Sequence, residues 1–448
     1  MKEGNHLFTN RDLRLLLVPV IVEQVLSSLM GTADTLMVSN VGSAAISAVS
    51  LVDSINVLVI QMFSALAAGG AIICSQYIGQ GDTANARSSA EQLLLVTGGI
   101  SILLAAVCLI FNEPLLGLIF GKVEQEVMSN SITYFFYTAL SFPFIALYNA
   151  GSSVFRAQQN TRLPMTISVI SNIMNIVGNA ILIFGCQMGV AGAAISTLVS
   201  RIFCAAAVLY FLRLPRQEVV VKDYLKMRPN IRRMKLILSV GIPTGVENGM
   251  FQFGKLAIQS TVSTLGTAAI AAQAMTNILE NLNGIAAIGV GIGLMTVVGQ
   301  CIGAGRRDEA VYYVKKLSLV AEVILAASCL LVYLAARPVT ILGGMEAESA
   351  RMCIYMMTWI TVIKPIVWVP SFIPAYGMRA AGDVKFSMIL SCISMWVCRV
   401  SLCVFLCRVM GFGPMGVWIG MFTDWTVRGI FYLIRFHRRK WLEHHLIG

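Results

Sequence analysis

The feature that most constrains the fold is a series of long apolar runs. Residues 93–111 and 317–336 are stretches of predominantly apolar side chains, long enough to cross the hydrocarbon core of a bilayer as α-helices. They lack the strict alternation of apolar and polar residues that the strands of a membrane barrel show. Only 12% of the residues are charged, about half the share in soluble proteins. The sequence therefore predicts an all-α membrane protein and excludes disordered, fibrous and nucleic-acid-binding classes.

Glycines, prolines and charged clusters divide the chain into segments of about 20 residues or more. We count twelve such spans, at approximately 13–38, 44–78, 86–111, 131–156, 163–186, 190–212, 236–262, 268–302, 310–335, 351–378, 386–408 and 415–434. Three prolines in the tenth span, Pro365, Pro370 and Pro374, make it the strongest candidate for a bend.

The positions of lysine and arginine orient the spans. With the amino terminus in the cytoplasm, the loops on that side carry 24 of the 33 Lys and Arg residues, the opposite loops carry 4 and the spans carry 5. Because cytoplasmic loops are enriched in basic residues, both termini are expected in the cytoplasm. The net charge of +11 is then explained by topology, without an anionic partner.

The chain also repeats itself at half its length. When the sequence is shifted by half of its 448 residues, Pro19 and Glu23 align with Pro243 and Glu247, the run 42–48 with 266–272, and the loop 79–81 with 303–305. With small changes in the shift, 155–160 matches 378–383, and Arg201 matches Arg428. Each half holds six spans, an even number, so the halves are expected to be parallel copies related by a pseudo-two-fold axis along the membrane normal.

This repeat predicts the domain organisation. Residues 1–212 and 236–434 would form two six-helix bundles, joined by a basic cytoplasmic linker at 213–235 and followed by a basic cytoplasmic tail at 435–448. Transporters built from repeats bind their substrate where the repeats meet. The sequence therefore predicts a central cleft and alternating access.

Several short motifs occur in one order along the whole chain. They are Gly-Thr-Ala-Asp-Thr-Leu-Met at 31–37, the loops at 79–82 and 303–306, Phe-Arg-Ala-Gln-Gln-Asn-Thr at 155–161, and Gly-Val-Ala-Gly-Ala-Ala-Ile-Ser-Thr at 189–197. With these motifs the chain resembles the multidrug and toxic compound extrusion (MATE) family, of the bacterial type. The resemblance implies a multi-pass antiporter of the bacterial cytoplasmic (inner) membrane. It would export organic compounds or drugs, cationic and amphipathic, in exchange for Na⁺ or H⁺.

Ionisable residues inside spans are functional candidates, because burying a charge in a bilayer is costly. Relatives similar to this chain hold Na⁺ with a first-helix Asp, two polar residues of the fifth helix, and a carbonyl and a Thr hydroxyl of the sixth. The matching positions here are Asp34, Asn175, Asn179, Ala193 and Thr197. Some relatives carry a second Asp at the position of Asn179, so this site is less able to share a proton. The alternative is that the two Asn side chains only bridge helices.

The second half does not keep this site, because Ile258 takes the place of Asp34. It offers instead a polar set with adaptable apolar neighbours, which suits an organic cation. We expect the substrate-binding residues to be Glu23, Glu247, Met250, Gln273, Met275, Asn277, Glu280 and Asn281. Two alternatives stay open: Lys255 could neutralise Glu247 or Glu280 as a structural pair, and Glu23 could bridge helices.

The other acids in the spans have structural interpretations. Asp53 and Asn56 on the second span predict a polar helix contact, and Asp424 and Arg428, four residues apart, predict an ion pair. We expect Glu322 to face Lys364 or Arg399.

Motifs for other chemistries are absent from the sequence. There is no GxxxxGK[ST] motif for ATP and no arrangement of nucleophile and base. We therefore expect no enzyme activity, no cofactor besides the coupling ion, no nucleic-acid partner, and a monomer in the lipid bilayer. The alternative function is a lipid-linked oligosaccharide flippase of the same architecture, for which Lys255, Lys364 and Arg399 could bind the pyrophosphate.

Overall fold

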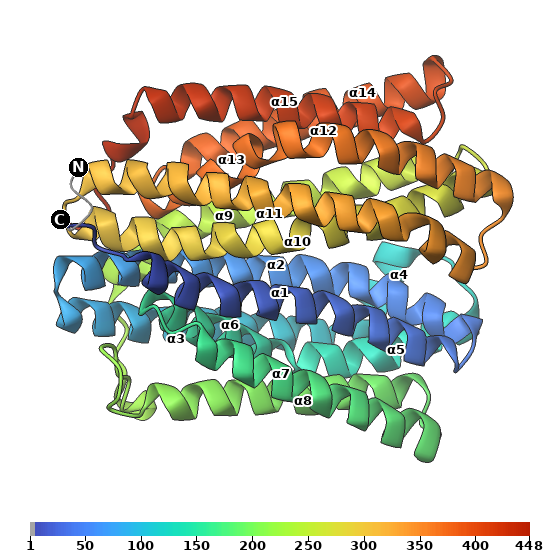
Figure 1. Ribbon diagram of the computed structural model, residues 1–448. Coiled ribbons are helices and arrows are strands. Elements are labelled where there is room, and N and C mark those ends of the chain that lie inside the picture. Colours follow the sequence, from blue (N-terminus) through green and yellow to red (C-terminus); the bar gives the residue numbers. More distant parts are fainter. Residues whose placement is uncertain (1–4) are drawn as a thin grey trace. The chain divides into compact units, whose positions relative to one another are not determined.

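The described part of the chain is mostly helical. A computed structural model describes residues 5–448, in which helices joined by short segments account for the structure and no β-strand occurs. Long helices lie alongside one another in each half of the chain (Figure 1). The all-α class predicted from the apolar runs is confirmed.

Each predicted span corresponds to a helix or to helical segments in series. The first half contains α1 (Asn10–Ser39), α2 (Ser43–Gln80), α3 (Thr83–Ile110), α4 (Asn112–Phe120), α5 (Gln125–Leu140), α6 (Phe142–Ala157), α7 (Arg162–Asn179) with a π-helical end (Ala180–Gly185), and α8 (Val190–Leu212). The second half contains α9 (Ile231–Val262), α10 (Thr267–Gly303), α11 (Arg307–Leu342), α12 (Ala347–Ala380), α13 (Val384–Ile393), α14 (Ser401–Val404) and α15 (Met415–His437). Two π-helical segments, Ser394–Val400 and Phe405–Val409, continue α13 and α14, and short 3₁₀ turns lie at Tyr224–Lys226 and Lys440–Leu442.

Most of these helices could cross a bilayer by length and composition alone. Among residues 5–448, nine helices meet both conditions, or ten if the bent pair α5 and α6 is one span. The two other predicted spans, α9 and α15, contain several charged residues. Large apolar side chains face outward on the long helices, such as Leu103 on α3 and Leu331 on α11, each 68% exposed. Such surfaces suit contact with lipid.

The broken span is the fourth and not the tenth. The helices α5 and α6 meet at Ser141 with a bend of 42°, whereas α12 continues from Ala347 to Ala380 through its three prolines. Pro143 lies in the first turn of α6, where its ring and missing N–H prevent a continuous helix across the junction. The tenth span therefore has no break at its prolines, and the bend expected within it stays a prediction.

The turns repeat at the shift found in the sequence. Gly42 and Gly266 precede α2 and α10 with φ of 143° and 99°, and Gly81 and Gly305 follow the same helices with φ of 83° and 74°. Glycine adopts these positive φ values without the strain that a Cβ atom adds. The π-helical segments Ala180–Gly185 and Phe405–Val409 also lie one repeat apart. The duplication therefore extends to backbone conformation.

The described chain divides into two compact units whose boundaries lie inside helices. One unit contains residues 26–245, and the other contains residues up to 25 together with 246–448. We call them the central unit and the split unit. The helices α1 and α9 therefore each contribute to both units. The predicted bundle boundaries at 212 and 236 stay a prediction.

Each unit has its own packed interior. In the central unit, α2 packs against α3, α5 and α6, and α7 packs against α8, with Phe63, Phe135 and Phe142 in the core. In the split unit, α10 packs against α11 and α12, and α12 packs against α15. The first described residues are fixed to α11, because the Tyr313 hydroxyl accepts a hydrogen bond from the Phe8 amide and donates one to its carbonyl.

Candidate functional site

The polar centre of the central unit is built around Asp34 on α1. Both carboxylate oxygens accept hydrogen bonds from Nδ2 of Asn175 at 2.8 Å, and Oδ1 also accepts one from Nδ2 of Asn179. The two asparagines are four residues apart on α7, so their side chains lie on the same face of that helix. The structure thus brings together three of the five residues predicted for a cation site.

The sixth span reaches this centre through Ser196 rather than Thr197. The Ser196 hydroxyl donates to the Asn175 carbonyl oxygen at 2.9 Å and lies 3.1 Å from its Oδ1 atom. Ala193 is buried and Thr197 is half-buried on α8, but among the described residues neither is hydrogen-bonded to Asp34. One residue along a helix is a rotation of about 100°, which is why neighbouring hydroxyls contact different groups.

A buried acceptor lies beside the carboxylate. The Oδ1 atom of Asn179 is buried and has no hydrogen-bond partner among the described residues. A buried oxygen without a hydrogen-bond partner usually lowers the stability of the fold, because it has lost its contacts with water. Together with the Asp34 carboxylate and the Asn175 amide, it provides the oxygen donors that a hard cation prefers.

A second acid, Asp53 on α2, is held in the same manner. Its Oδ1 atom accepts hydrogen bonds from Asn56 at 3.3 Å and from the Tyr134 hydroxyl at 3.1 Å. The predicted contact between Asp53 and Asn56 is therefore confirmed, with Tyr134 as an additional partner. Arg201 donates to the Ser141 hydroxyl at 2.6 Å, and its charge acts on both Asp34 and Asp53. This link connects the polar centre to the bend between α5 and α6.

In the split unit the corresponding position is occupied by the protein's own cations. Asp424 on α15 forms ion pairs with Arg399 at 2.5 Å and with Arg428 at 3.2 Å. All three side chains are at most 4% exposed. The half-length shift aligns Arg399 with Asn175, so a fixed guanidinium stands where the first half has a neutral amide. The predicted pair of Asp424 with Arg428 is confirmed.

Glu247 and Glu280 in the split unit have partners other than the expected Lys255. Glu280 pairs with Lys364 at 2.7 Å, and Glu247 pairs with Arg379 at 3.0 Å and accepts from the Ser391 hydroxyl at 2.8 Å. Lys255 is exposed and pairs with neither acid among the described residues. The alternative that assigned them to Lys255 was therefore wrong in its partner.

The predicted partners of Glu322 are also taken. Lys364 pairs with Glu280, and Arg399 pairs with Asp424. Glu322 itself lies half-buried on α11. Within the described chain, the expected contact of Glu322 with either cation is not formed.

The polar residues proposed for substrate contact are only partly accessible. Gln273 is buried, accepts from the Trp418 indole at 3.0 Å and lies 3.4 Å from Asn277. Asn281 is exposed. The other candidates divide by burial: Glu23 and Glu247 are buried, and Met250, Met275, Asn277 and Glu280 are half-buried.

Sequence reasoning did not find several residues that lie around Asp34 and Asp53. Tyr134, Ser141 and Ser196 are neutral side chains without a distinctive spacing, so no pattern identified them. Arg201 could have been found, because the repeat aligns it with Arg428, which was predicted to pair with Asp424. An arginine that lies inside a span in both halves indicates a partner nearby.

The comparisons with known proteins agree with the fold and the repeat. A family model described as MatE matches residues 19–181 and 243–405, two segments related by the same half-length shift. A probable multidrug resistance protein, NorM of Thermotoga maritima, is 26% identical over 96% of this chain and 93% of its own length. The uncharacterized transporter YisQ of Bacillus subtilis is 27% identical over 95% and 93%.

Solved structures show the same architecture. A crystal structure of a MATE protein in complex with MaL6 superposes with a TM-score of 0.89, at 20% identity, over 96% of this chain and 98% of that one. This fold has twelve helices in two bundles, as the spans predict. The relatives are transporters and not enzymes. Because the family model covers well over half of the sequence, this chain belongs to the MatE family of multidrug efflux transporters.

Proposed function

We propose that the chain is a secondary active antiporter that exports organic compounds in exchange for Na⁺ or H⁺ by alternating access. The observation that carries this proposal is how the acids are held. Among the described residues, Asp34 and Asp53 are bound by neutral amide and hydroxyl donors, whereas Glu247, Glu280 and Asp424 are bound by fixed cations. The Asp34 and Asp53 carboxylates, whose direct partners are neutral, are thus better placed than the other three acids to bind a mobile ion.

The polar centre supports competition between an ion and the asparagine amides. In the described arrangement the Asn175 and Asn179 amide groups donate to the Asp34 carboxylate. We propose that an entering cation displaces these donors and that the amides then rotate to present their oxygens, with Thr197 and the Ala193 carbonyl as further donors. A carboxylate and several neutral oxygens match the preference of a hard cation. Binding of the cation would favour one conformation of the transporter, and binding of the substrate would favour the other.

We propose cationic, amphipathic organic compounds as substrates. Asn277, Glu280 and Asn281 on α10 offer polar contacts, and Met250 and Met275 offer an adaptable apolar surface. Glu280 is 12% exposed and already bound to Lys364, so a substrate cation would share this carboxylate with the lysine. Glu247 is buried in its pair with Arg379, which supports a structural role.

The flippase alternative has less support. A pyrophosphate group requires uncompensated cations, but Lys364 and Arg399 are each paired with an acid. The remaining candidate, Lys255, is exposed. A single lysine is a poor match for a doubly charged headgroup.

The proposal is tested by flux in vesicles. Purified protein is reconstituted into liposomes that contain a fluorescent organic cation, and inward Na⁺ or H⁺ gradients are imposed separately. We expect at least one gradient to drive export, and its dissipation to stop it. Equal flux with and without both gradients would contradict ion coupling.

Replacing Asn179 with Asp should shift the coupling toward protons. The variant places two carboxylates beside each other, and because they resist being ionised together they hold one proton between them. We expect H⁺-driven export to rise severalfold, on the order of the coupling between interacting sites, relative to Na⁺-driven export. The measurement is the ratio of the two fluxes in vesicles. Asn160→Asp, on an exposed turn, is the matched control, and an unchanged ratio in Asn179→Asp would argue against proton sharing at Asp34.

A further inference from the structure

The linker between the two halves is part of the central unit and is hydrogen-bonded to its helices. Gln92 on α3 donates to the Arg228 carbonyl at 2.8 Å and accepts from the Asn230 amide at 2.9 Å, so one side chain binds the linker backbone twice. Tyr224 donates to the Leu209 carbonyl at 2.5 Å. Burial raises the pKa of the Tyr224 hydroxyl to about 12, so it stays protonated at alkaline pH values that would begin to ionise an exposed tyrosine. These hydrogen bonds hold the linker in one conformation against α3 and α8.

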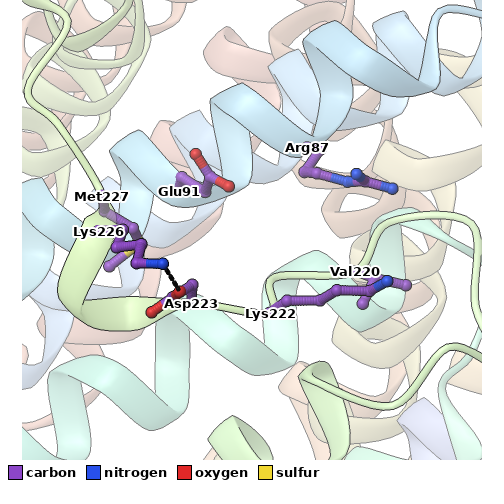
Figure 2. A pocket seen from close by; sticks show the side chains of 7 residues that line it. All are labelled: Arg87, Glu91, Val220, Lys222, Asp223, Lys226 and Met227. Carbon is purple, nitrogen blue, oxygen red and sulfur yellow. Dashed lines mark ion pairs between the residues drawn. The ribbon is translucent and has the colours of Figure 1, made fainter.

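A cavity of about 180 Å³ lies between this linker and α3. Its charged lining residues are Arg87 and Glu91 from α3, and Lys222, Asp223 and Lys226 from the linker. Figure 2 shows Arg87 and Lys222 on opposite walls, with Lys226 turned toward Asp223. Three cations against two carboxylates leave a net charge of +1 on the lining.

Asp223 and Glu91 compensate only part of the positive charge of the cavity. Asp223 forms an ion pair with Lys226 at 3.4 Å, and Glu91 lies close enough to Arg87 for their charges to attract each other. Among the described residues, neither Arg87 nor Lys222 belongs to an ion pair within 4 Å. An anion with several acceptor oxygens could bind between these two side chains.

Two apolar side chains of the linker lie at or next to this cavity. Leu225, between Tyr224 and Lys226, is 99% exposed, and Met227 lines the cavity itself. The surrounding segment 213–235 carries eight Lys and Arg residues and two acids. An exposed apolar side chain among cations next to a membrane span is typical of a segment that lies in the headgroup region of anionic lipids.

We propose that this cavity binds the phosphate of an anionic phospholipid headgroup, on the side of the membrane that the charge asymmetry predicts to be cytoplasmic. Arg87 and Lys222 would contact the phosphate, and Leu225 would enter the upper acyl region. The positive-inside rule accounts for the number of basic residues in the linker. It does not require a lysine of the linker and an arginine of α3 to share one cavity.

The test is titration of the detergent-purified full chain with phosphatidylglycerol, followed by native mass spectrometry. Arg87→Gln/Lys222→Gln should weaken phosphatidylglycerol binding by about 30-fold, since each cation near a membrane surface contributes about a factor of five. Leu225→Ser should also weaken lipid binding and leave binding of inorganic phosphate unchanged. Phosphatidylcholine, which has no net charge, should bind weakly to all variants.

A matched double variant distinguishes a specific lipid-binding site from nonspecific attraction between anionic lipid and a basic protein. Arg216→Gln/Lys385→Gln removes the same charge from two exposed positions outside the cavity and should bind phosphatidylglycerol as the unmodified chain does. Lys222→Gln alone, at an exposed position, serves if the double variant unfolds. Equal loss in the matched control would overturn the proposal, and so would displacement of the lipid by inorganic phosphate at the same concentration, which would indicate a free-anion site.

Discussion

Replacing Asp34 with Asn is expected to abolish ion-coupled export while the protein remains folded. The substitution removes the one carboxylate in the hydrogen-bonded group of Asp34, Asn175 and Asn179 but keeps the size of the side chain. An amide in this position can still exchange hydrogen bonds with its neighbours, so packing is preserved. Gradient-driven flux should fall by at least about tenfold, within the range of typical coupling free energies.

Three measurements distinguish lost coupling from lost structure. Thermal unfolding and size-exclusion chromatography should match the unmodified protein, and equilibrium binding of the fluorescent substrate should be retained. Asp12→Asn, which changes an acid in the first turn of the same helix, should export normally. Normal export by Asp34→Asn under either gradient would show that the coupling ion does not use this carboxylate.

Of the substitutions considered, Asp424→Asn should lower the stability of the folded protein the most. Asp424 is fully buried and is the acid that pairs with both Arg399 and Arg428. Removing one partner of a buried ionic group leaves charge without compensation, which typically costs about 3–5 kcal/mol. Both guanidinium groups also lie near the Phe251 ring, at 5.5 and 4.6 Å from its centroid, but an aromatic ring compensates a buried cation only weakly. We expect much less folded protein and a clearly lower unfolding temperature.

The same cluster provides an internal control. Arg399→Gln leaves Asp424 paired with Arg428 and should destabilise by only about 1 kcal/mol, the scale of one hydrogen bond. The double variant Asp424→Asn/Arg399→Gln buries one uncompensated cation instead of two, so it should be more stable than Asp424→Asn. If the loss of stability in the double variant equals the sum of the losses in the two single variants, Asp424 and Arg399 are not electrostatically coupled.

The repeat and the first-half centre could be predicted because both depend on order along the chain. The half-length shift aligned the turns at Gly42 and Gly266, and the structure gives both a positive φ. Asn175 and Asn179 share a helix face by spacing alone, and the family resemblance assigned them to the same group as Asp34. The pair of Asp424 with Arg428 was predicted for the same reason, since it lies within one helix.

Contacts between different helices could not be predicted in this way. Which lysine or arginine faces Glu247 or Glu280 depends on the rotation and depth of each helix, and the amino-acid sequence gives neither directly. Lys255 was close in sequence but is exposed, while Arg379 and Lys364 come from a distant helix. The π-helical segment Ser394–Val400 changes the rotation of the helix that carries Arg399, and no composition signal marks such segments.

The split unit has a consequence for biosynthesis. Its first residues, which include Phe8 at the Tyr313 hydroxyl, leave the ribosome before any of their partners in 246–448 have been made. The central unit, residues 26–245, is continuous and can be completed while the rest of the chain is still being translated. The start of α1 must therefore remain without these partners until α11 has been made and inserted. Assembly of the split unit thus joins an early segment to a helix that is made only after the central unit is complete.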